Sequence, residues 1–524
     1  MIKKRLLFSL MLFSFLLIGC TNEDVSNDKR QQDKVPEAEE RLSKDAITFI
    51  VAVPSNTPEE DIIFMENYQP EGIVANRMEK IGPHTHKISF MPEDIEQSVD
   101  KHGNAVYYYR YNRNDYGFIA AEYIEPDGYP DGTAMPRSVL FIPGKIYEDK
   151  VERWRWFPEG EINYKTYIEP NSDFPSRIDD IEFRSGQAIQ DLYVPAFDNF
   201  FDSTAKHIKE MGYKWVVLMP PWQWVESEPL PKVANSIELG FNTDPNYLND
   251  EKLKEHIRAF KNNGLNVHLA PQICCTEIDK QGRSKEWWQE YSREVERFLV
   301  HHARLAEEEK VDSFLFDVFG DKGKGFDNPE VRYKEILHTI KNEFSGEIGS
   351  SVAIWMDENK VPNGIIPQAN FFTFADELDF FILSTDAKVS LEDTPNDEEL
   401  EEGAGNLMDY AKVLYDTYKK PIVVQTAYAS AEQSWKGASG IDFIKSMNTP
   451  WFPEKDSKYN FSGQDQAMVF NAYFEAIAER PWIIGLYNFG YWNWEMPLAP
   501  DISVRGKQAE NLWQKWNEII YNNG

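Results

Sequence analysis

Residues 215–220 read WVVLMP, residues 266–271 read NVHLAP and residues 421–428 read PIVVQTAY. Each is a short, continuous apolar run, which is typical of a parallel strand buried on both faces. The C-terminal part of the chain holds a series of such runs: IQDLYVPA, WVVLMP, NVHLAP, SFLFDVF, SVAIWM, LDFFIL, PIVVQTAY and WIIGLYNF.

Helical patterns alternate with these runs. Apolar residues at three- and four-residue spacing predict helices at 251–263, 285–309, 399–418 and 464–479, and Gly264 follows the first of them as a C-terminal cap. Eight strands alternating with helices predict a (β/α)8 TIM barrel over residues 187–524. No glycine-rich phosphate loop follows the first run, which argues against a nucleotide-binding fold.

The preceding segment, residues 46–160, has a different rhythm. Its apolar residues alternate with polar ones in short runs such as KISFMP and AVYYYRYNRN, and Pro, Gly, Asn and Asp separate the runs. Period-two alternation with frequent turn residues predicts antiparallel strands, and several of them at this spacing predict a β-sandwich or a small barrel, of which we expect the sandwich.

The N-terminus carries a targeting signal. A basic Lys3-Lys4-Arg5 cluster precedes the apolar residues 6–18, which are too few to span a membrane, and Gly19-Cys20 follows. Residues 1–20 resemble the signal peptide and lipobox of bacterial lipoproteins, which implies lipid attachment at Cys20. Residues 21–45 are polar and predict a disordered tether. We therefore expect a lipid-anchored protein on the extracellular face of the cell membrane.

Charge and cysteine content limit the possible partners. The formal net charge is −32, which repels phosphate backbones and makes nucleic acid an unlikely partner. Membrane contact is expected only through the N-terminal lipid. The chain has three cysteines, two of them adjacent at 274 and 275, so a disulfide scaffold is not expected.

In a barrel, the residues that follow each strand share one rim and carry the chemistry. The predicted rim combines carboxylates with aromatic and amide side chains. Strand 4 ends in Asp317, strand 5 in Asp357 and Glu358, and strand 6 in Asp386. The candidate substrate-binding residues are Trp222, Trp224, Gln272, Trp355, Gln425, Tyr428, Tyr487, Trp492 and Trp494.

This mixture is the one that a saccharide requires. The apolar C–H faces of a sugar stack on aromatic rings, and its hydroxyl groups bind amides and carboxylates. A glycosidic bond is cleaved between one acid and one base or nucleophile. The rim therefore predicts a cleft for a polysaccharide or oligosaccharide, with no cofactor and no metal. For any single tryptophan, a packing role is the competing interpretation.

Two family resemblances support this interpretation. The N-terminal motifs Val53–Pro58, Tyr108–Tyr111 and Tyr147–Trp154 are similar to the starch-binding-like β-sandwich found beside many bacterial glycosidases. The C-terminal segments resemble family 113 glycoside hydrolases, which are clan A TIM barrels and retaining enzymes known for β-mannan cleavage. The segments that carry this second resemblance are 209–218, 249–271, 287–288, 355–358, 378–381, 420–428 and 481–485.

The chain departs from the family at the catalytic positions. The resemblance implies an acid/base Glu after strand 4 and a nucleophilic Glu after strand 7, and these positions fall on Phe319 and Gln425. Phenylalanine has no proton to give, and an amide is a poor nucleophile. The clan A mechanism therefore does not transfer directly to this sequence.

Another pair of carboxylates remains. We expect Asp317 to act as nucleophile or base and Glu358 as acid, with Asp357 as the rival acid, because neighbouring strand ends place such groups a few ångströms apart. The alternative is a non-catalytic carbohydrate-binding lipoprotein, which Phe319 and Gln425 favour. A cell-surface scaffold whose rim binds protein is a third interpretation.

Overall fold

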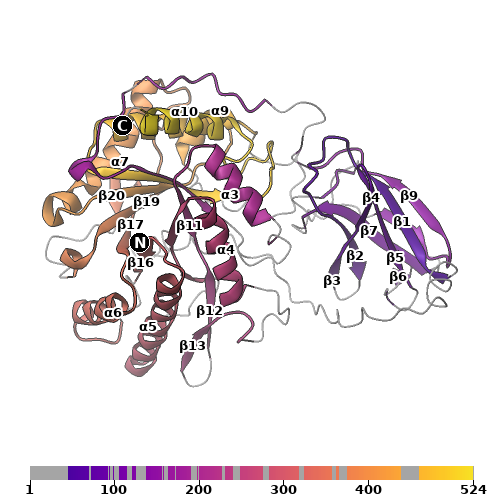
Figure 1. The fold of residues 1–524 in the computed structure, drawn as a ribbon, viewed down its shortest axis with the longest axis horizontal. Helices are drawn as coiled ribbons and strands as arrows, with labels where there is room; N and C mark the ends of the chain where they lie inside the picture. Colours follow the sequence, from indigo (N-terminus) through magenta and orange to yellow (C-terminus); the bar gives the residue numbers. More distant parts are fainter. Residues whose placement is uncertain are drawn as a thin grey trace.

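The computed structural model shows an N-terminal body of β-sheets beside a larger barrel (Figure 1). It describes residues 45–522 with internal gaps. The gaps are 70–71, 92–93, 95–97, 100–104, 115–120, 125–136, 156, 158–162, 172, 190–197, 199, 227–229, 240–247, 275–281, 318–323, 357–361, 365–373 and 438–459. The signal peptide, Cys20 and almost all of the tether therefore lie outside the described residues.

Eight parallel strands close into a barrel, which confirms this part of the predicted fold. In chain order they are β10 (Arg184–Ile189), β11 (Trp215–Leu218), β14 (Asn266–Leu269), β16 (Ser313–Leu315), β17 (Glu347–Met356), β19 (Phe380–Thr385), β20 (Ile422–Thr426) and β21 (Ile483–Tyr491). Each pairs with the next in parallel, and β21 returns to pair with β10. The carboxyl ends of all eight strands therefore meet at one end of the barrel.

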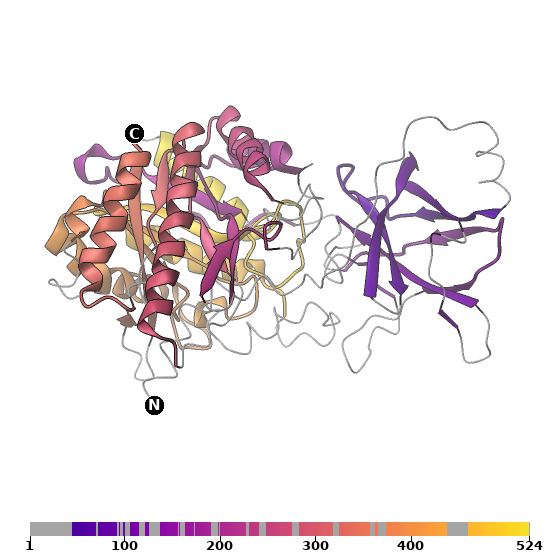
Figure 2. The same ribbon diagram turned by 90° about the horizontal axis from the view of Figure 1, so that it is seen from below.

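Among the described residues, seven α-helices belong to the barrel and cover its wall (Figures 1 and 2). They are α3 (Phe201–Glu210), α4 (Asp250–Asn262), α5 (Lys285–Glu308), α6 (Pro329–Glu343), α7 (Asp397–Tyr418), α9 (Gly463–Ala478) and α10 (Gln508–Asn522). Side-chain caps mark the first residues of several helices. Asn249 caps α4 by accepting from the Lys252 amide at 3.0 Å, and Asn396 caps α7 by forming a capping box with Glu399. Gly264, at φ +74°, follows α4 as predicted.

The first barrel strand is the main correction to the predicted fold. Sequence analysis placed it at 189–196, whereas the strand is Arg184–Ile189. Its sequence, RSGQAI, is polar and yet wholly buried. Two of its polar side chains have partners far along the chain: Arg184 pairs with the half-exposed Glu347, and Gln187 accepts from Asn488 at 2.9 Å. A strand built largely of polar residues lacks the apolar run that predicted the others.

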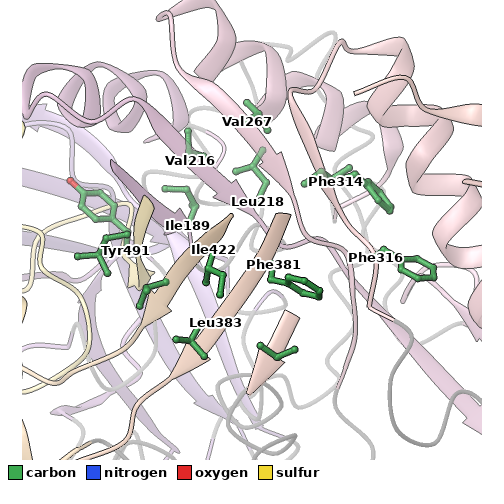
Figure 3. Close-up of a cluster of buried hydrophobic side chains, with 14 of the residues drawn as sticks. Ile189, Val216, Leu218, Val267, Phe314, Phe316, Phe381, Leu383, Ile422 and Tyr491 are labelled. Atoms are coloured by element: carbon green, nitrogen blue, oxygen red, sulfur yellow. The ribbon is translucent and has the colours of Figure 1, made fainter. Parts of the chain in front are cut away.

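Alternate residues of each strand belong to two different clusters. One set packs between the barrel wall and the helices, which we call the outer cluster; Figure 3 shows Val216, Leu218, Phe381 and Leu383 of this set. The other set fills the barrel, which we call the inner cluster: Ala188, Trp215, Val217, Met219, Ala270, Leu315, Phe380, Ile382, Val423, Ala427, Ala429, Ala431, Ile484, Tyr487, Phe489 and Ile502. Cluster membership therefore gives the direction of each side chain.

Contacts between non-adjacent strands confirm that the inner cluster lies inside the barrel. The Arg184 guanidinium on β10 lies 4.7 Å from the ring centroids of both Trp215 and Phe380, and it pairs with Glu347 at 2.7 Å. His268 on β14 lies 5.9 Å from Phe380, measured between ring centroids. Burial, with the nearby Arg184 charge, lowers the pKa of His268 to about 3, so the imidazole is neutral at physiological pH.

The N-terminal body contains two sheets. One has the order β4 (Glu79–Gly82), β5 (Thr85–Phe90), β1 (Ile47–Ala52), β9 (Ile146–Lys150). The other has the order β3 (Gly72–Arg77), β2 (Ile63–Gln69), β7 (Ala105–Arg113), β6 (Ser98–Val99), with β8 (Arg137–Leu140) also on β7. All pairs are antiparallel, as predicted, except β1 with β9. Phe49 and Val51 of one sheet share a buried cluster with Met65 and Tyr109 of the other.

Short elements complete the barrel. The carboxyl-end loops contain β12 (Pro221–Glu226), β13 (Pro231–Ala234), β15 (Gln272–Cys274) and β18 (Pro362–Gly364), and 3-10 turns occur at Ile178–Asp180, Ala375–Glu377 and Ser434–Lys436. Of the helices that the structure describes, none has the length and apolar character needed to cross a bilayer.

Candidate active site at the carboxyl end of the barrel

Asp317 lies where sequence analysis placed it, directly beyond strand β16. Leu315 belongs to the inner cluster and Phe316 to the outer cluster, where its ring packs on Phe374. Alternation of side chains along an extended chain predicts that Asp317 points toward the barrel axis. Its side chain is half-buried.

The strand 5 candidates cannot be placed in the same way. Trp355 is part of β17, which pairs there with Asn363 of β18, but its side chain is outside the described set. Asp357 and Glu358 both fall in the undescribed segment 357–361, and Phe319 falls in 318–323. The roles assigned to these residues therefore stay predictions.

Strand 6 supplies a carboxylate to which sequence analysis gave no role. Asp386 directly follows β19, and its neighbours Thr385 and Ala387 lie on the outer side, where Ala387 belongs to the outer cluster. Alternation therefore predicts that Asp386 faces the axis, and its charge also acts on Tyr428 and Tyr473 of the outer cluster. Its Oδ2 atom is shielded from solvent and has no hydrogen-bond partner among the described residues. Burial raises the pKa of Asp386 from its ordinary value of 3.8 to about 7.

Strand 7 brings Gln425 to the same level of the barrel. Gln425 is buried and lies in register with Ser384 on one side and Tyr487 on the other. Val423 and Ala427 belong to the inner cluster, so Gln425 also points inward. The Ser384 hydroxyl, two residues before Asp386, is buried and has no partner in the described part of the chain.

Tyr428 lies outside the barrel wall. Its hydroxyl donates to the Ala387 carbonyl at 2.7 Å and lies 2.9 Å from the Tyr473 hydroxyl. Burial keeps the pKa of Tyr428 well above its ordinary value, so the phenol is neutral. The structure thus shows Tyr428 supporting the backbone next to Asp386, and its predicted contact with substrate stays untested.

The tryptophans after strand 2 pack against α5. The Trp222 ring lies 5.4 Å from Phe298 and 4.9 Å from His301, measured between centroids, and Trp224 meets Trp287 edge to face at 6.2 Å. Both are buried. The packing interpretation describes these contacts, and stacking on sugar stays a prediction. Gln272 is half-buried, and its amide donates to the Met219 sulfur at 3.4 Å.

The strand 8 aromatics are also buried. Tyr487 fills the barrel beside Gly186, where an added Cβ would lie only 2.6 Å from the tyrosine ring. Trp492 and Trp494 lie 5.8 Å apart in the outer cluster, with 4% and 2% of their surfaces exposed. Rings with so little exposed surface offer no free face in this conformation, so their sugar contacts also remain predictions.

A buried ion pair holds the loop after strand 8. The Lys507 ammonium lies 2.5 Å from Asp501 Oδ1, 2.9 Å from the Ser430 hydroxyl and 2.8 Å from the Ala499 carbonyl. Each of its three protons therefore meets an acceptor. Burial lowers the pKa of Lys507, and burial likewise raises the pKa of Asp501. This network ties the loop after strand 7 to the loop after strand 8.

Comparison with known proteins assigns the barrel to a family. A model of Glycoside Hydrolase Family 113 matches residues 201–513, which is more than half of the chain. The chain belongs to glycoside hydrolase family 113. A search of curated protein sequences found no match.

Solved structures of family 113 proteins are among the structural neighbours. A structure described as a complex of a GH113 β-1,4-mannanase has 17% identity and a TM-score of 0.47, covering 64% of this chain and 99% of its own. The GH113 β-mannanase AaManA from Alicyclobacillus acidocaldarius has 16% identity and a TM-score of 0.44, with coverages of 67% and 100%. An endo-β-1,4-mannanase from Thermotoga petrophila has 13% identity and a TM-score of 0.39, with coverages of 66% and 77%.

The chain belongs to family 113 and yet differs from it at the implied catalytic positions. The position implied for the nucleophilic Glu is Gln425, which the structure places inside the barrel on β20. In the described part of the chain, the carboxylates within two residues of a barrel strand's carboxyl end are Asp317 and Asp386. No group of three or more His, Cys, Asp or Glu side chains in the described ranges could hold a metal ion. The arrangement therefore offers carboxylate chemistry at the barrel mouth.

Proposed function

We propose that this chain is a lipid-anchored family 113 glycoside hydrolase that cleaves a polysaccharide or oligosaccharide outside the cell. The observation that carries the proposal is the half-buried Asp317, two residues beyond strand β16 of a family 113 barrel. In the proposed reaction, Asp317 acts as nucleophile or base. A second carboxyl group donates a proton to the leaving oxygen, and Glu358 or Asp357 was the sequence-based expectation for it.

The second candidate function is carbohydrate binding without catalysis. Gln425 favours it, because an amide at the position implied for the nucleophile can hydrogen-bond a sugar hydroxyl but cannot form a glycosyl ester. The same barrel would then hold a glycan and release it unchanged. Hydrolysis by the wild type separates the two functions directly.

The experiment compares the wild type with Asp317→Asn on β-mannan, β-glucan and cell-wall glycan. β-Mannan is the first substrate because the resemblance to family 113 implies it. We expect new reducing ends with the wild type, a loss of about 10²–10⁴-fold in the variant, and unchanged binding in affinity electrophoresis. Unchanged turnover in Asp317→Asn contradicts the role of Asp317. Binding without turnover by the wild type supports the second function instead.

The proposal also includes the N-terminal features. We expect Cys20→Ala to move the protein from the membrane fraction to the medium, because residue 20 would carry the lipid. The two N-terminal sheets, which share one buried cluster, would form the starch-binding-like sandwich and hold carbohydrate beside the barrel. Retention of the Cys20→Ala protein in the membrane fraction would contradict the anchor.

A further inference from the structure

The N-terminal body exposes aliphatic side chains around one turn, residues 140–146, which we call the apolar turn. It connects β8 of one sheet with β9 of the other. Phe141 and Tyr147 pack against the buried cluster that the two sheets share. The residues that alternate with them point away from this cluster. Three of these are about half exposed: Leu140 at 49%, Ile142 at 42% and Ile146 at 58%.

Hydrogen bonds hold the apolar turn in one conformation. The Lys145 amide donates to the Ile142 carbonyl at 3.1 Å, and Gly144 between them has φ +73°, as the third residue of a type II turn requires. The Tyr147 hydroxyl donates to the Leu140 carbonyl at 2.5 Å. The backbone therefore keeps the aliphatic side chains turned outward, although contact of apolar surface with water is unfavourable.

The apolar turn lies beside the point where the described chain begins. The Gly144 amide donates to the Ala46 carbonyl at 3.1 Å, and the Thr48 amide donates to the Lys145 carbonyl at 3.0 Å. Cys20 is 26 positions before Ala46. A disordered tether of this length, which the sequence predicts, spans about 30 Å on average. A lipid on residue 20 would therefore keep the apolar turn close to the membrane surface.

The chemistry of the apolar turn fits a lipid surface. Its aliphatic side chains offer no flat ring on which a sugar could stack. Residues 137–147 contain two basic residues and no acidic one, in a chain whose net charge is −32. One of the two, Arg137, pairs with Glu122, and the other, Lys145, is exposed. Apolar side chains next to a cation suit the boundary between acyl chains and anionic headgroups.

We propose that the apolar turn inserts into the lipid surface beside the anchor, with Lys145 at the headgroup phosphates. This inference rests on the lipid anchor of the proposed function. It adds a second contact to a membrane that the sequence led us to expect only at the lipid. Because the anchor keeps the turn at a high local concentration, a contact that is weak by itself is sufficient.

Strand β7 separates the apolar turn from the barrel. At its first residue, the Ala105 carbonyl accepts from the Phe141 amide at 3.3 Å. At its last residue, the Arg113 guanidinium donates to the Glu495 carbonyl in the loop after strand 8 at 3.4 Å. β7 has nine residues, so its two ends lie about 27 Å apart. Insertion of the apolar turn is therefore compatible with a barrel mouth that stays in water.

The test uses the full-length lipidated chain in vesicles of equal parts phosphatidylcholine and phosphatidylglycerol. A photo-crosslinking p-benzoylphenylalanine is placed at position 142, 146 or 81. After illumination we expect crosslinks to phospholipid at positions 142 and 146, at least about tenfold above those at position 81.

Position 81 is the matched control. Ile81 is 48% exposed and lies on β4 of the same body. The neighbouring Gly82 pairs with Thr85, which pairs with Ala52 at the end of β1, whereas Ile146 pairs near the start of β1. The control therefore has similar exposure at the opposite end of the same sheet.

A second measurement removes the anchor. The Cys20→Ala protein recovered from the medium is sedimented with the same vesicles. We expect Ile142→Glu in this protein to lower the affinity for vesicles about tenfold and Ile81→Glu to leave it unchanged. Equal affinity of the two glutamate variants would contradict insertion of the apolar turn.

The outcomes separate this inference from the proposed function. An anchored chain without phospholipid crosslinks at positions 142 and 146 overturns the inference, while the anchor stands. Crosslinks to a second copy of the chain in place of lipid also overturn it, because the apolar turn would then be a contact between copies. A Cys20→Ala protein that stays in the membrane fraction overturns the anchor and this inference with it. Hydrolysis of mannan is measured separately and depends on neither result.

Discussion

The loop after strand 8 and the end of strand 6 lie at the same end of the barrel, and they differ in whether a buried carboxylate has a charged partner. In the loop, the Lys507 ammonium has three acceptors, among them Asp501 Oδ1, although Asp501 Oδ2 has no hydrogen-bond partner among the described residues. At the end of strand 6, Asp386 Oδ2 and the Ser384 hydroxyl have no hydrogen-bond partner in the described part of the chain.

This difference distinguishes the structural loop around Asp501 and Lys507, which we call the frame, from the candidate ligand site around Asp386 and Ser384, which we call the site. Paired charges fix the loop in one conformation, and breaking such a pair is costly because a buried charge is left behind. Unpartnered groups lower stability in the free protein and gain it when a ligand arrives. Substitutions in the frame should therefore reduce stability, whereas substitutions in the site should reduce activity and leave stability equal or higher.

The largest expected effect is at the frame. Asp501→Asn removes the negative charge and leaves Lys507 buried without a counter-ion. We expect the free energy of unfolding to fall by about 3–5 kcal/mol, measured by urea unfolding at pH 7. Ser430→Ala is the control, because it removes one neutral acceptor and should cost only about 1 kcal/mol. Equal effects of the two variants would show that the charge pair is not what holds the loop.

The next-largest effect is expected at Asp386, where a substitution should raise the free energy of unfolding. Folded Asp386 keeps its proton up to about pH 7, whereas the unfolded chain releases it near pH 3.9. The unfolded state therefore binds fewer protons between these values, and stability falls as pH rises from about 4 to 7. Asp386→Asn lacks this loss, so it should be more stable than the wild type at pH 8 by up to about 4 kcal/mol and show little difference at pH 4. Thermal unfolding at both pH values checks this prediction, and a variant less stable than the wild type at pH 8 would refute it.

The same serine-to-alanine substitution at two buried positions tests this comparison between partnered and unpartnered groups. Ser384 and Ser350 are both buried, but the Ser350 hydroxyl donates to the Phe316 carbonyl at 2.7 Å and that of Ser384 has no partner among the described residues. We expect Ser350→Ala to cost about 1 kcal/mol of stability and Ser384→Ala to be neutral or slightly stabilising. Ser384→Ala should instead raise KM for mannan several-fold. A larger stability loss in Ser384→Ala than in Ser350→Ala would remove Ser384 from the site.

The smallest effect is expected on the outside of the barrel. Lys412 and Asp416 on α7 form an ion pair at 2.7 Å with about half of each side chain exposed. Asp416→Asn should change the free energy of unfolding by less than about 0.5 kcal/mol, and added salt should remove even that difference. A loss comparable to that of Asp501→Asn would show that burial is not what distinguishes the two pairs.

The sequence predicted most of the barrel because apolar runs and helical spacing are local signals. It misplaced the first strand because RSGQAI carries buried polar groups whose partners, such as Glu347 and Asn488, lie far along the chain. It placed both Asp317 and Asp386 at the rim but gave Asp386 no role, because the shielding of one carboxylate oxygen depends on the whole wall around it. The run FFILSTD, with a carboxylate closing an apolar strand, was the available signal.

The tryptophans show the same limit. They follow strands 2 and 8 of the barrel, and Trp222 and Trp224 lie on the short strand β12. Whether a ring faces a cleft or a helix depends on contacts such as that of Trp222 with Phe298, which residue type and spacing do not reveal.

The Arg184 side chain determines which end of the barrel a glycan can use. Its guanidinium lies between Trp215 and Phe380, and Glu347 balances its charge. Arg184 therefore fills the amino-terminal end of the barrel, and His268 and Tyr487 occupy the next layer of the interior. A polymer therefore has no tunnel to thread. Under the proposed function, its backbone would lie across the carboxyl end of the barrel, and cleavage products would leave by the side from which the substrate came.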